Sequence, residues 1–350
     1  MLMKNLFPVE KLKEFDDHKC VIPLLDAKSG LRGFIAIHRS HLQNPSFGAT
    51  RFWPYNTEIE ALQDALKLSR AMSYKAALAG LKHGGAKGII WAQKHQEKNQ
   101  VLEAYLQRVN LLGGNFITGA DIGISPENLL LMRRKSPYIV GLKADAPKFT
   151  ALGLYYSLQV CLKEVFGTED LKERTFAIQG LGKIGTSLLE MIYRQSRQIW
   201  VADVDQKRVA LLKKQFPRIK AVAPNEIYLQ KADVFSPCAL AGVLNNKTIP
   251  RLRCQIVVGG ANNQLADPRA GEQLRKQEIL YSPDYVVNAG GLISVVDEFE
   301  NKKYSSRRIA AKVFKIRQKL KEIINESKKR REATNLIADE MAQKVVESFV

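Results

Sequence analysis

Residues 72–91 read Met-Ser-Tyr-Lys-Ala-Ala-Leu-Ala-Gly-Leu-Lys-His-Gly-Gly-Ala-Lys-Gly-Ile-Ile-Trp. The first part of this stretch is typical of a helix, and the apolar run at its end is typical of a strand. We expect Gly84 and Gly85 to form the turn between them, because glycine adopts backbone angles closed to other residues and lets a ligand approach the main chain.

Lys75 and Lys87 flank this expected turn, and each lies among small or apolar residues. A single lysine is most often a solvated amine, because lysine is rarely buried without a partner. Two lysines at the ends of a Gly-Gly turn favour a site that binds an anion and uses an amine of lowered pKa. Burial or a nearby like charge lowers the pKa of a lysine by several units, which makes the amine a usable general base.

A second motif lies in the middle of the chain, where the pattern changes to alternating strands and helices. A strand-like run, residues 175–179, is followed by Gly180, Leu181, Gly182, Lys183, Ile184 and Gly185, which open a helix. A lone Gly-x-Gly-x-x-Gly is a weak signal, but one placed between a strand and a helix is typical of a dinucleotide site. Its glycines allow a tight turn and let a pyrophosphate approach the helix N-terminus.

An acidic residue strengthens this interpretation. Asp203 ends the next strand-like run, about twenty residues after the glycines, where a carboxylate accepts hydrogen bonds from a ribose 2′-hydroxyl and repels a 2′-phosphate. The motif therefore predicts NAD rather than NADP as the cofactor, although Lys207 and Arg208 lie nearby.

The two motifs resemble those of the amino acid dehydrogenases that act on glutamate, leucine, phenylalanine and valine. The likeness extends over separate motifs from about Phe47 to Glu298, and it is greatest to the leucine branch. It implies that Lys75 pairs with the α-carboxylate of an amino acid and that Lys87 activates the water that attacks an imine. It also implies that Asp121 carries protons to and from the amino group. From its sequence context alone, Asp121 is more often a turn residue.

The same resemblance implies an apolar substrate side chain. The glutamate enzymes have a lysine at the position of Phe47 and a serine at the position of Val295, and both hold the side-chain carboxylate of glutamate. Phenylalanine and valine cannot do so. Gly48 lies in a segment that is beside the substrate in the family. From the residue alone, Phe47 is explained nearly as well as ordinary core.

Five further residues match cofactor or substrate contacts of the family: Thr150, Cys238, Ala239, Asn262 and Asn288. The two asparagines follow expected strands, and ligands of a doubly wound sheet bind beyond the carboxyl ends of its strands. Either asparagine alone is equally typical of a turn. The segment 143–147, just before Thr150, departs from the pattern of the leucine branch.

The expected fold is α/β with two domains and an active site in the cleft between them. Residues 1–145, with a C-terminal tail of about 326–350, form the domain for substrate binding, catalysis and oligomer formation. Residues 146–325 form the doubly wound Rossmann domain that binds NAD. Expected strands are 20–25, 31–38, 88–91, 175–179, 198–202, 232–237, 255–259 and 285–288, and expected helices begin at Thr57 and at about Glu97. The partners implied are a small L-amino acid and further copies of the chain.

Composition limits the alternatives. The 350 residues carry a net charge of +19, which raises the possibility of a nucleic-acid partner. Much of the excess lies in residues 302–331, where apolar residues at helical spacing favour a helix with a buried stripe and a basic, solvated face. We therefore expect no nucleic-acid partner and, with no long apolar run or signal peptide, no membrane partner. Four scattered cysteines favour a reducing, cytoplasmic setting, and the histidine spacing predicts no metal site.

The predicted function is NAD-dependent, reversible oxidative deamination of an apolar, branched-chain L-amino acid. One alternative within enzymes is an aromatic amino acid dehydrogenase, since residues 292–294 depart from the usual leucine-enzyme residues. Two alternatives lie in other classes: a basic NAD-binding module that binds nucleic acid without catalysis, and a protein that uses its dinucleotide-binding domain for assembly.

Overall fold

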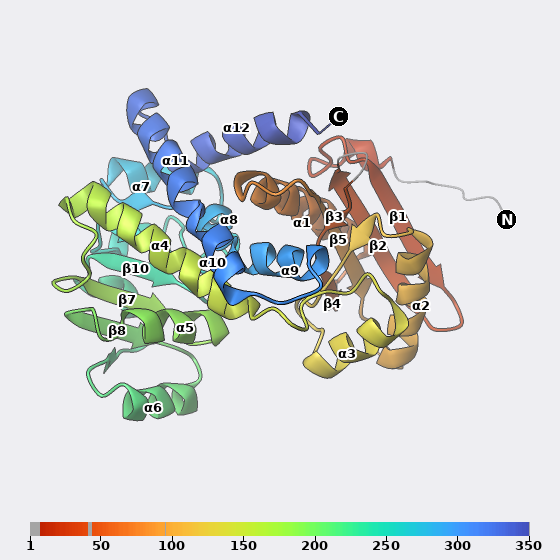
Figure 1. Ribbon diagram of the computed structural model, residues 1–350, viewed down its shortest axis with the longest axis horizontal. Coiled ribbons are helices and arrows are strands. Elements are labelled where there is room, and N and C mark those ends of the chain that lie inside the picture. The colour runs from red at the N-terminus through yellow and green to blue at the C-terminus, as the bar shows by residue number, and fades with distance from the viewer. Residues whose placement is uncertain (1–7, 41–43, 95, 350) are drawn as a thin grey trace. The chain divides into compact units, whose positions relative to one another are not determined.

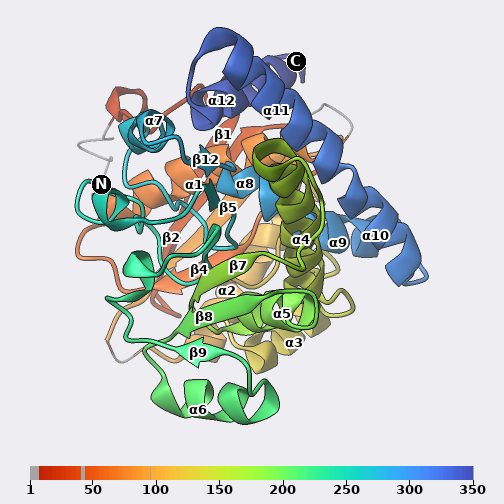
Figure 2. The same cartoon turned by 90° about the vertical axis from the view of Figure 1, so that its left-hand side faces the viewer.

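The computed structural model describes residues 8–40, 44–94 and 96–349 (Figures 1 and 2). The chain divides into two compact units. Unit 1 takes the described parts of 1–144, 298–302 and 342–350, and unit 2 takes 145–297 and 303–341. This division differs from the expected one in the tail, because residues 326–341 group with unit 2.

Unit 1 is built on a mixed six-stranded sheet with the order β1-β2-β5-β3-β6, in which β4 also pairs with β5. The strands are β1 Cys20–Asp26, β2 Leu31–Arg39, β3 Ser46–Phe47, β4 Thr50–Trp53, β5 Gly84–Trp91 and β6 Phe116–Ile117. β1, β2 and β5 pair antiparallel, whereas β3 and β4 pair parallel to β5. The two expected strands near the N-terminus are confirmed as β1 and β2.

Helices cover both faces of this sheet: α1 Glu58–Leu78, α2 Lys98–Leu111 and α3 Pro126–Lys135, after a short 3-10 turn at Val9–Lys11. Alternate residues of β5 face opposite ways. Ile89 joins the core under α1, whereas Ala86 and Ile90 join the core under α2. Lys87 therefore shares the α1 side of the sheet with Gly85 and Ile89.

The expected turn at Gly84 and Gly85 is wrong, because both residues belong to β5. The chain turns earlier, at Gly80, where φ is +69°. A Cβ on Gly84 would lie 1.6 Å from the carbonyl oxygen of Arg39, and a Cβ on Gly85 would lie 2.0 Å from the amide nitrogen of Ser73. These glycines therefore let β2 and α1 pack against β5.

α1 begins as expected at Thr57, whose hydroxyl accepts a hydrogen bond from the backbone N–H of Glu60 at 3.2 Å. The carboxylate of Glu60 reaches back one residue further than in a capping box, to the N–H of Asn56 at 2.9 Å. The helix then runs 21 residues and carries Lys75 in its last turn.

Unit 2 is built on a six-stranded parallel sheet with the order β12-β11-β10-β7-β8-β9. Its strands are β7 Thr175–Gln179, β8 Gln198–Ala202, β9 Lys220–Ala221, β10 Val234–Pro237, β11 Ile256–Val257 and β12 Leu280–Tyr281. Numbered within the unit, this is the order 6-5-4-1-2-3 of a doubly wound dinucleotide-binding sheet. The order reverses between β7 and β10, which is where ligands bind in such sheets.

Helices again cover both faces. Those of unit 2 are α4 Ala146–Phe166, α5 Lys183–Ile192, α6 Gln206–Gln215, α7 Arg269–Lys276, α8 Asp284–Val287, most of α9 Gly290–Glu300, α10 Ser306–Phe314, α11 Ile316–Arg330 and the start of α12 Thr334–Glu347, with 3-10 turns at Ile227–Leu229 and Ile249–Arg251. Both views show α4 and α5 beside β7 and β8 (Figures 1 and 2). A second core lies on the opposite face, where Phe235 and Val257 pack with Leu274 of α7.

One expected strand is wrong, and the expected basic helix is present as two helices. Residues 284–287 form the short helix α8, because Pro283 precedes an apolar run too short to distinguish a strand from a buried helical turn. The basic segment forms α10 and α11, and its apolar stripe, Val313, Ile316, Leu320, Ile323 and Ile324, is buried. No helix among the described residues is long and apolar enough to cross a membrane.

Candidate active site

Two elements of unit 1 carry the lysines singled out in the sequence. Lys75 lies half-buried in the last turn of α1, and Lys87 lies in the middle of β5 with 5% of its surface exposed. Because Gly85 has no Cβ, α1 approaches β5 closely, and both lysines lie on the α1 side of the sheet. The sequence predicted the helix and the strand that carry these lysines, although it placed the glycines in a turn between them.

The structure brings Asp121 to Lys87. The Nζ of Lys87 donates a hydrogen bond to Oδ2 of Asp121 at 2.5 Å, and the backbone N–H of Asp121 is held by the carbonyl of Thr50 at 3.1 Å. Burial lowers the pKa of the Lys87 amine, although the attraction of Asp121 opposes this. Burial favours the neutral form of Asp121, but the charges of Lys87 and Arg51 outweigh it and hold its pKa at about 2.

Three residues that the sequence did not single out complete this cluster. Arg51 donates from Nε to Oδ2 of Asp121 at 2.9 Å and from Nη1 to Oδ2 of Asp64 at 2.8 Å. The hydroxyl of Tyr55 donates to the same oxygen of Asp64 at 2.5 Å. A signal was present for Arg51, since it is the only charged residue in the strand Thr50–Trp53. No comparable signal indicated Asp64, because it lies 13 residues from Arg51 in the chain.

Phe47 is fully buried in an aromatic group of unit 1. Its ring packs edge-to-face on His83 at 4.7 Å and on Phe299 at 5.4 Å between centroids. Phe299 itself is 42% exposed and lies one helical turn after Val295 on α9. Gly48 follows Phe47, and a Cβ there would lie 1.9 Å from the carbonyl oxygen of Ala86. The sequence missed His83 and Phe299.

In unit 2, the glycine motif forms the loop between β7 and α5. Gly180 has φ of +91°, which favours glycine, and a Cβ on Gly185 would lie 1.9 Å from the carbonyl oxygen of Gly180. Gly182 caps α5 and is exposed, and apart from its chain neighbours no described residue has an atom within 4 Å of where its Cβ would be. Lys183 and Ile184 begin the helix. A helix N-terminus left open by a glycine fits the pyrophosphate of a dinucleotide.

Asp203 lies directly behind this loop. Its Oδ2 accepts from the N–H of Leu181 at 2.6 Å, and its Oδ1 accepts from the N–H of Asp205 at 2.8 Å. Arg208 pairs with it at 3.3 Å. Although burial opposes ionisation, these backbone hydrogen bonds and the charge of Arg208 lower the pKa of Asp203. The carboxylate retains lone pairs for a ribose hydroxyl, because each of its oxygens accepts more than one hydrogen bond.

Cys238 and Ala239 meet the glycine loop from the end of β10. A Cβ on Gly180 would lie 2.5 Å from the Cβ of Ala239, and a Cβ on Gly185 would lie 3.3 Å from that of Cys238. Burial raises the pKa of the Cys238 thiol to about 11, so it is not a nucleophile at neutral pH. These residues line the point where the strand order reverses.

Asn262, Asn288 and Thr150 are further predicted residues of unit 2. Asn288 is buried and donates from Nδ2 to Oδ1 of Asn262 at 3.0 Å. Within residues 8–40, 44–94 and 96–349, no group donates to Oδ1 of Asn288, so a buried acceptor is left for a ligand. Thr150 lies on α4, where its hydroxyl donates to the carbonyl of Ala146 at 2.8 Å and approaches Gly291.

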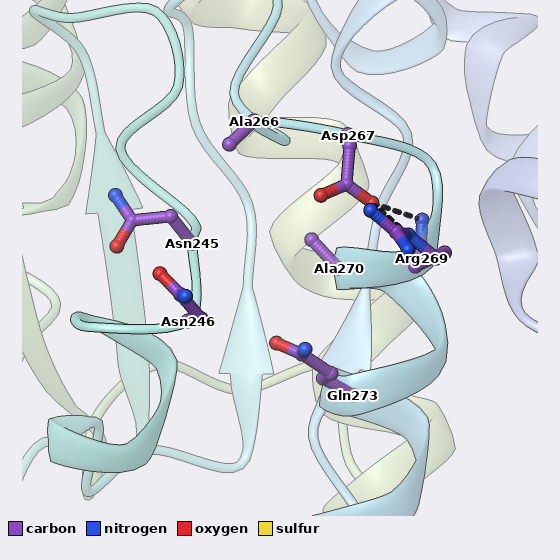
Figure 3. Close-up of a pocket in the computed structure, with 7 residues that line it drawn as sticks. All are labelled: Asn245, Asn246, Ala266, Asp267, Arg269, Ala270 and Gln273. Atoms are coloured by element: carbon purple, nitrogen blue, oxygen red, sulfur yellow. Dashed lines mark hydrogen bonds and ion pairs between the residues drawn. The ribbon is translucent and has the colours of Figure 1, made fainter.

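A pocket of about 330 Å³ lies elsewhere in unit 2 and includes none of the predicted residues (Figure 3). It is lined by Asn245, Asn246, Ala266, Asp267, Arg269, Ala270 and Gln273. Both polar groups of Asn245 hold the local backbone, with Nδ2 donating to the carbonyl of Gly242 and Oδ1 accepting from the N–H of Lys247. Arg269 pairs with Asp267 at 3.2 Å. These groups serve the loop itself.

Two family models match the chain. Residues 18–138 match the family model described as Glu/Leu/Phe/Val dehydrogenase, dimerisation domain, and residues 201–347 match the model described as Glutamate/Leucine/Phenylalanine/Valine dehydrogenase. A leucine dehydrogenase of Geobacillus stearothermophilus is 36% identical over 349 residues, covering 97% of this chain and 93% of the relative. A phenylalanine dehydrogenase of Caldalkalibacillus thermarum is 38% identical over 346 residues, covering 95% and 93%.

A solved structure is also similar. The crystal structure of L-tryptophan dehydrogenase from Nostoc punctiforme matches with a TM-score of 0.84 and 37% identity, covering 95% of this chain and 96% of that chain. The chain therefore belongs to the Glu/Leu/Phe/Val dehydrogenase family. It is an amino acid dehydrogenase, an oxidoreductase that acts on CH–NH2 donors with a pyridine nucleotide, and it resembles leucine dehydrogenases over nearly its full length.

Proposed function

We propose that the protein catalyses the reversible oxidative deamination of an apolar L-amino acid, with a branched-chain substrate such as leucine first. One amino acid, one NAD⁺ and one water give the 2-oxo acid, ammonium, NADH and a proton. The observation that carries this proposal is the buried Lys87 amine, 2.5 Å from the ionised carboxylate of Asp121. A buried amine of lowered pKa beside a fixed carboxylate is suited to proton transfer at neutral to alkaline pH.

Three side chains of unit 1 have separate roles in the proposed reaction. Lys75 pairs with the α-carboxylate of the substrate, and Lys87, once deprotonated, takes a proton from the water that attacks the imine. Asp121 exchanges protons with the amino group. Because the pKa of Asp121 is about 2 beside two cations, it receives a proton only when Lys87 is neutral or displaced. The order of these proton transfers therefore depends on the charge of Lys87.

Residues of unit 2 bind the cofactor in this proposal. Gly180, Gly182, Lys183, Ile184 and Gly185 hold the pyrophosphate, and Asp203, Thr150, Cys238, Ala239 and Asn262 complete the site. A bound nicotinamide supplies the hydride acceptor. Asn288 offers its Oδ1 to the substrate. Asp203 supports NAD over NADP, because its carboxylate repels a 2′-phosphate, although the neighbouring Arg208 reduces that repulsion.

The preference for an apolar substrate rests on Phe47, Gly48 and Val295. Phe47 is packed among aromatic rings and offers no charge to a substrate carboxylate. An aromatic substrate is the second candidate, and two relatives favour it, since their names state activity on phenylalanine and tryptophan. The free energy that discriminates between these two classes of substrate is small, because one or two methylene groups change it by only ~1–3 kcal/mol.

Assembly and setting belong to the same proposal. The family model matched by residues 18–138 is described as a dimerisation domain, which supports a homo-oligomer. The four cysteines are free thiols, which supports a reducing, cytoplasmic setting.

The test is NADH formation at alkaline pH with leucine, valine, isoleucine, phenylalanine, tryptophan and glutamate, with NADP in parallel. We expect turnover with NAD and a branched-chain amino acid. Better turnover of glutamate than of leucine would contradict the role of Phe47 and Val295. Lys87→Ala should lower kcat by at least about 100-fold, since a positioned general base contributes ~10²–10⁴-fold. Near-normal turnover of this variant would remove Lys87 from the chemistry.

A further inference from the structure

We propose that Arg51 is a positioning residue for the dehydrogenase reaction: its guanidinium bridges Asp121 and Asp64, and this bridge sets how readily Lys87 gives up its proton. The proposal rests on the role of Lys87 proposed above. It assigns a function to Arg51 and Asp64, which lie outside the residues singled out in the sequence.

Lys87 and Arg51 donate hydrogen bonds to the same oxygen of Asp121. Nζ of Lys87 and Nε of Arg51 both donate to Oδ2 of Asp121, at 2.5 and 2.9 Å. The planar guanidinium then reaches Asp64 with Nη1 at 2.8 Å. Only arginine can bridge two carboxylates in this way, because its donors lie in a rigid fork and lysine presents a single compact charge. Asp121 is thereby fixed from one side whether or not Lys87 is protonated.

The elements of unit 1 make this arrangement rigid. Arg51 lies on β4, which pairs with β5 next to Lys87, so the two cations come from neighbouring strands. Asp64 lies on α1, and Tyr55 lies in the segment between β4 and α1. The side chains of Arg51, Asp64 and Asp121 are each about one-fifth exposed, at 20%, 23% and 23%. Charges at this depth interact more strongly than at an open surface.

The charges of the cluster balance. Two cations, Lys87 and Arg51, face two carboxylates, Asp121 and Asp64, and Tyr55 adds a neutral donor because burial raises the pKa of its hydroxyl. Of the other elements packed against β5, α1 also carries Lys75 three turns beyond Asp64. On β2, the residue opposite Lys87 is the uncharged Ala36.

Arg51 and its two carboxylate partners act on the pKa of Lys87 in opposite directions. Burial lowers the pKa of Lys87 and Asp121 raises it, while the charge of Arg51 lowers it and that of Asp64 raises it. When Lys87 loses its proton, Arg51 remains charged and still compensates the carboxylate of Asp121, because burial cannot overcome the two acids that raise the pKa of Arg51. The neutral amine needed as a base is therefore formed without leaving Asp121 buried and uncompensated.

The test compares the pH dependence of kcat/KM for the best amino acid substrate in four variants. Arg51→Gln should move the rising limb to higher pH by about one to two units, as expected when a like charge within ~4–6 Å is removed. Asp64→Asn should move it to lower pH, because Arg51 then acts on Lys87 without compensation. Arg51→Lys should keep the limb within about half a unit but lower kcat, since lysine cannot bridge both carboxylates.

Tyr55→Phe is the matched control, because it removes one hydrogen bond to Asp64 without changing any charge, and we expect it to leave the limb in place. If Arg51→Gln does not fold, Asp64→Asn and Arg51→Lys still decide the matter. Shifts of the same sign in Arg51→Gln and Asp64→Asn, or no shift in Asp64→Asn, would overturn the proposal.

A second readout separates this proposal from the proposed function. The rate at which acetic anhydride acetylates Lys87, followed by mass spectrometry against pH, reports the protonation of the amine without turnover. Opposite shifts in Arg51→Gln and Asp64→Asn would support the bridge even if no amino acid were oxidised. Turnover in the wild type with identical acetylation profiles in all variants would leave the function standing and refute the bridge.

Discussion

At the scale of single residues, the pKa values of the site are set by burial and by neighbouring charges. Lys87 is buried in unit 1 with an amine of lowered pKa, and Asp121 stays ionised because two cations donate to one of its oxygens. Neither pKa follows from residue type. Each follows from the position of a neighbour that comes from another part of the chain.

A pair of histidines in unit 1 shows the same effect away from the lysines. His18 and His38 meet edge-to-face at 4.8 Å, and His38 has 1% of its surface exposed. The N–H of Asp16 donates to Nδ1 of His18 at 3.1 Å, so the proton of the neutral ring lies on Nε2, which reaches the carbonyl of Leu66 at 3.0 Å. Burial and the neighbouring His18 lower the pKa of His38 to about 4.

This pair predicts a loss of stability in mild acid. The unfolded chain binds a proton at His38 near the ordinary pKa of 6.5, whereas the folded chain does so only near 4. The contribution of neutral His38 to the free energy of unfolding should therefore be fully present above pH 6.5 and be lost between pH 6.5 and 4. At pH 5 the loss should be about 2 kcal/mol. Urea unfolding at pH 8 and pH 5 measures this. In His38→Gln the difference should shrink, and an unchanged difference would assign it to other groups.

At the scale of elements, glycines decide how closely helices approach strands. A Cβ at Gly85 would lie 2.0 Å from the backbone of α1, which cannot move aside as a flexible side chain does. Apart from its chain neighbours, a Cβ at Gly182, at the start of α5, would meet no described residue within 4 Å. The two positions therefore offer a matched pair, one for packing and one for binding.

We expect Gly85→Ala to destabilise the protein by at least about 3 kcal/mol, at the upper end of overpacking costs, because α1 must shift from β5. Gly182→Ala should leave the thermal midpoint within about 1 °C and weaken NAD binding, since its Cβ occupies the space where the pyrophosphate approaches. Thermal unfolding with and without NAD measures both effects. Equal destabilisation by the two substitutions would contradict the assignment of packing to one glycine and binding to the other.

The elements also show how far sequence reasoning reached. The strands β7 and β8 and the opening of α5 follow from short-range patterns, and their predicted bounds agree with the structure. The glycines of β5 were misplaced in a turn, because the pattern cannot tell glycine needed for backbone angles from glycine needed for close packing. α8 was mistaken for a strand, because a four-residue run with three apolar residues fits either period.

The site residues that could be predicted are likewise those that local motifs carry. Lys75, Lys87, Asp121 and the glycine loop were found because local motifs carry them. Arg51, Asp64 and Phe299 were missed because their partners lie 13 to 252 residues away in the chain, and a contact at such a separation leaves no local pattern. Phe299 adds a further difficulty, since an exposed aromatic residue on a helix is common and does not by itself indicate a pocket.

At the scale of the whole molecule, the excess of positive charge has a measurable consequence. The chain has 54 lysines and arginines against 35 aspartates and glutamates. Local ion pairs at the surface, such as Arg269 with Asp267, contribute only ~0–1 kcal/mol each and are weakened by salt. The excess charge acts over longer distances, because the Debye length is ~30 Å at 0.01 M salt and ~10 Å at 0.1 M. Repulsion across the molecule should therefore respond to salt more strongly than the pairs do.

We expect the thermal midpoint to rise by a few degrees between 10 and 150 mM NaCl, because screening relieves repulsion that destabilises the compact state. Replacing five exposed cations near α10 and α11 by glutamine should raise the midpoint at 10 mM NaCl and flatten its dependence on salt: Lys302, Lys303, Arg307, Lys315 and Lys321. A midpoint that falls with salt would mean that local ion pairs outweigh the net charge. Binding of duplex DNA that vanishes by 150 mM NaCl would have the same origin, since counterion release alone makes such binding steeply salt-dependent.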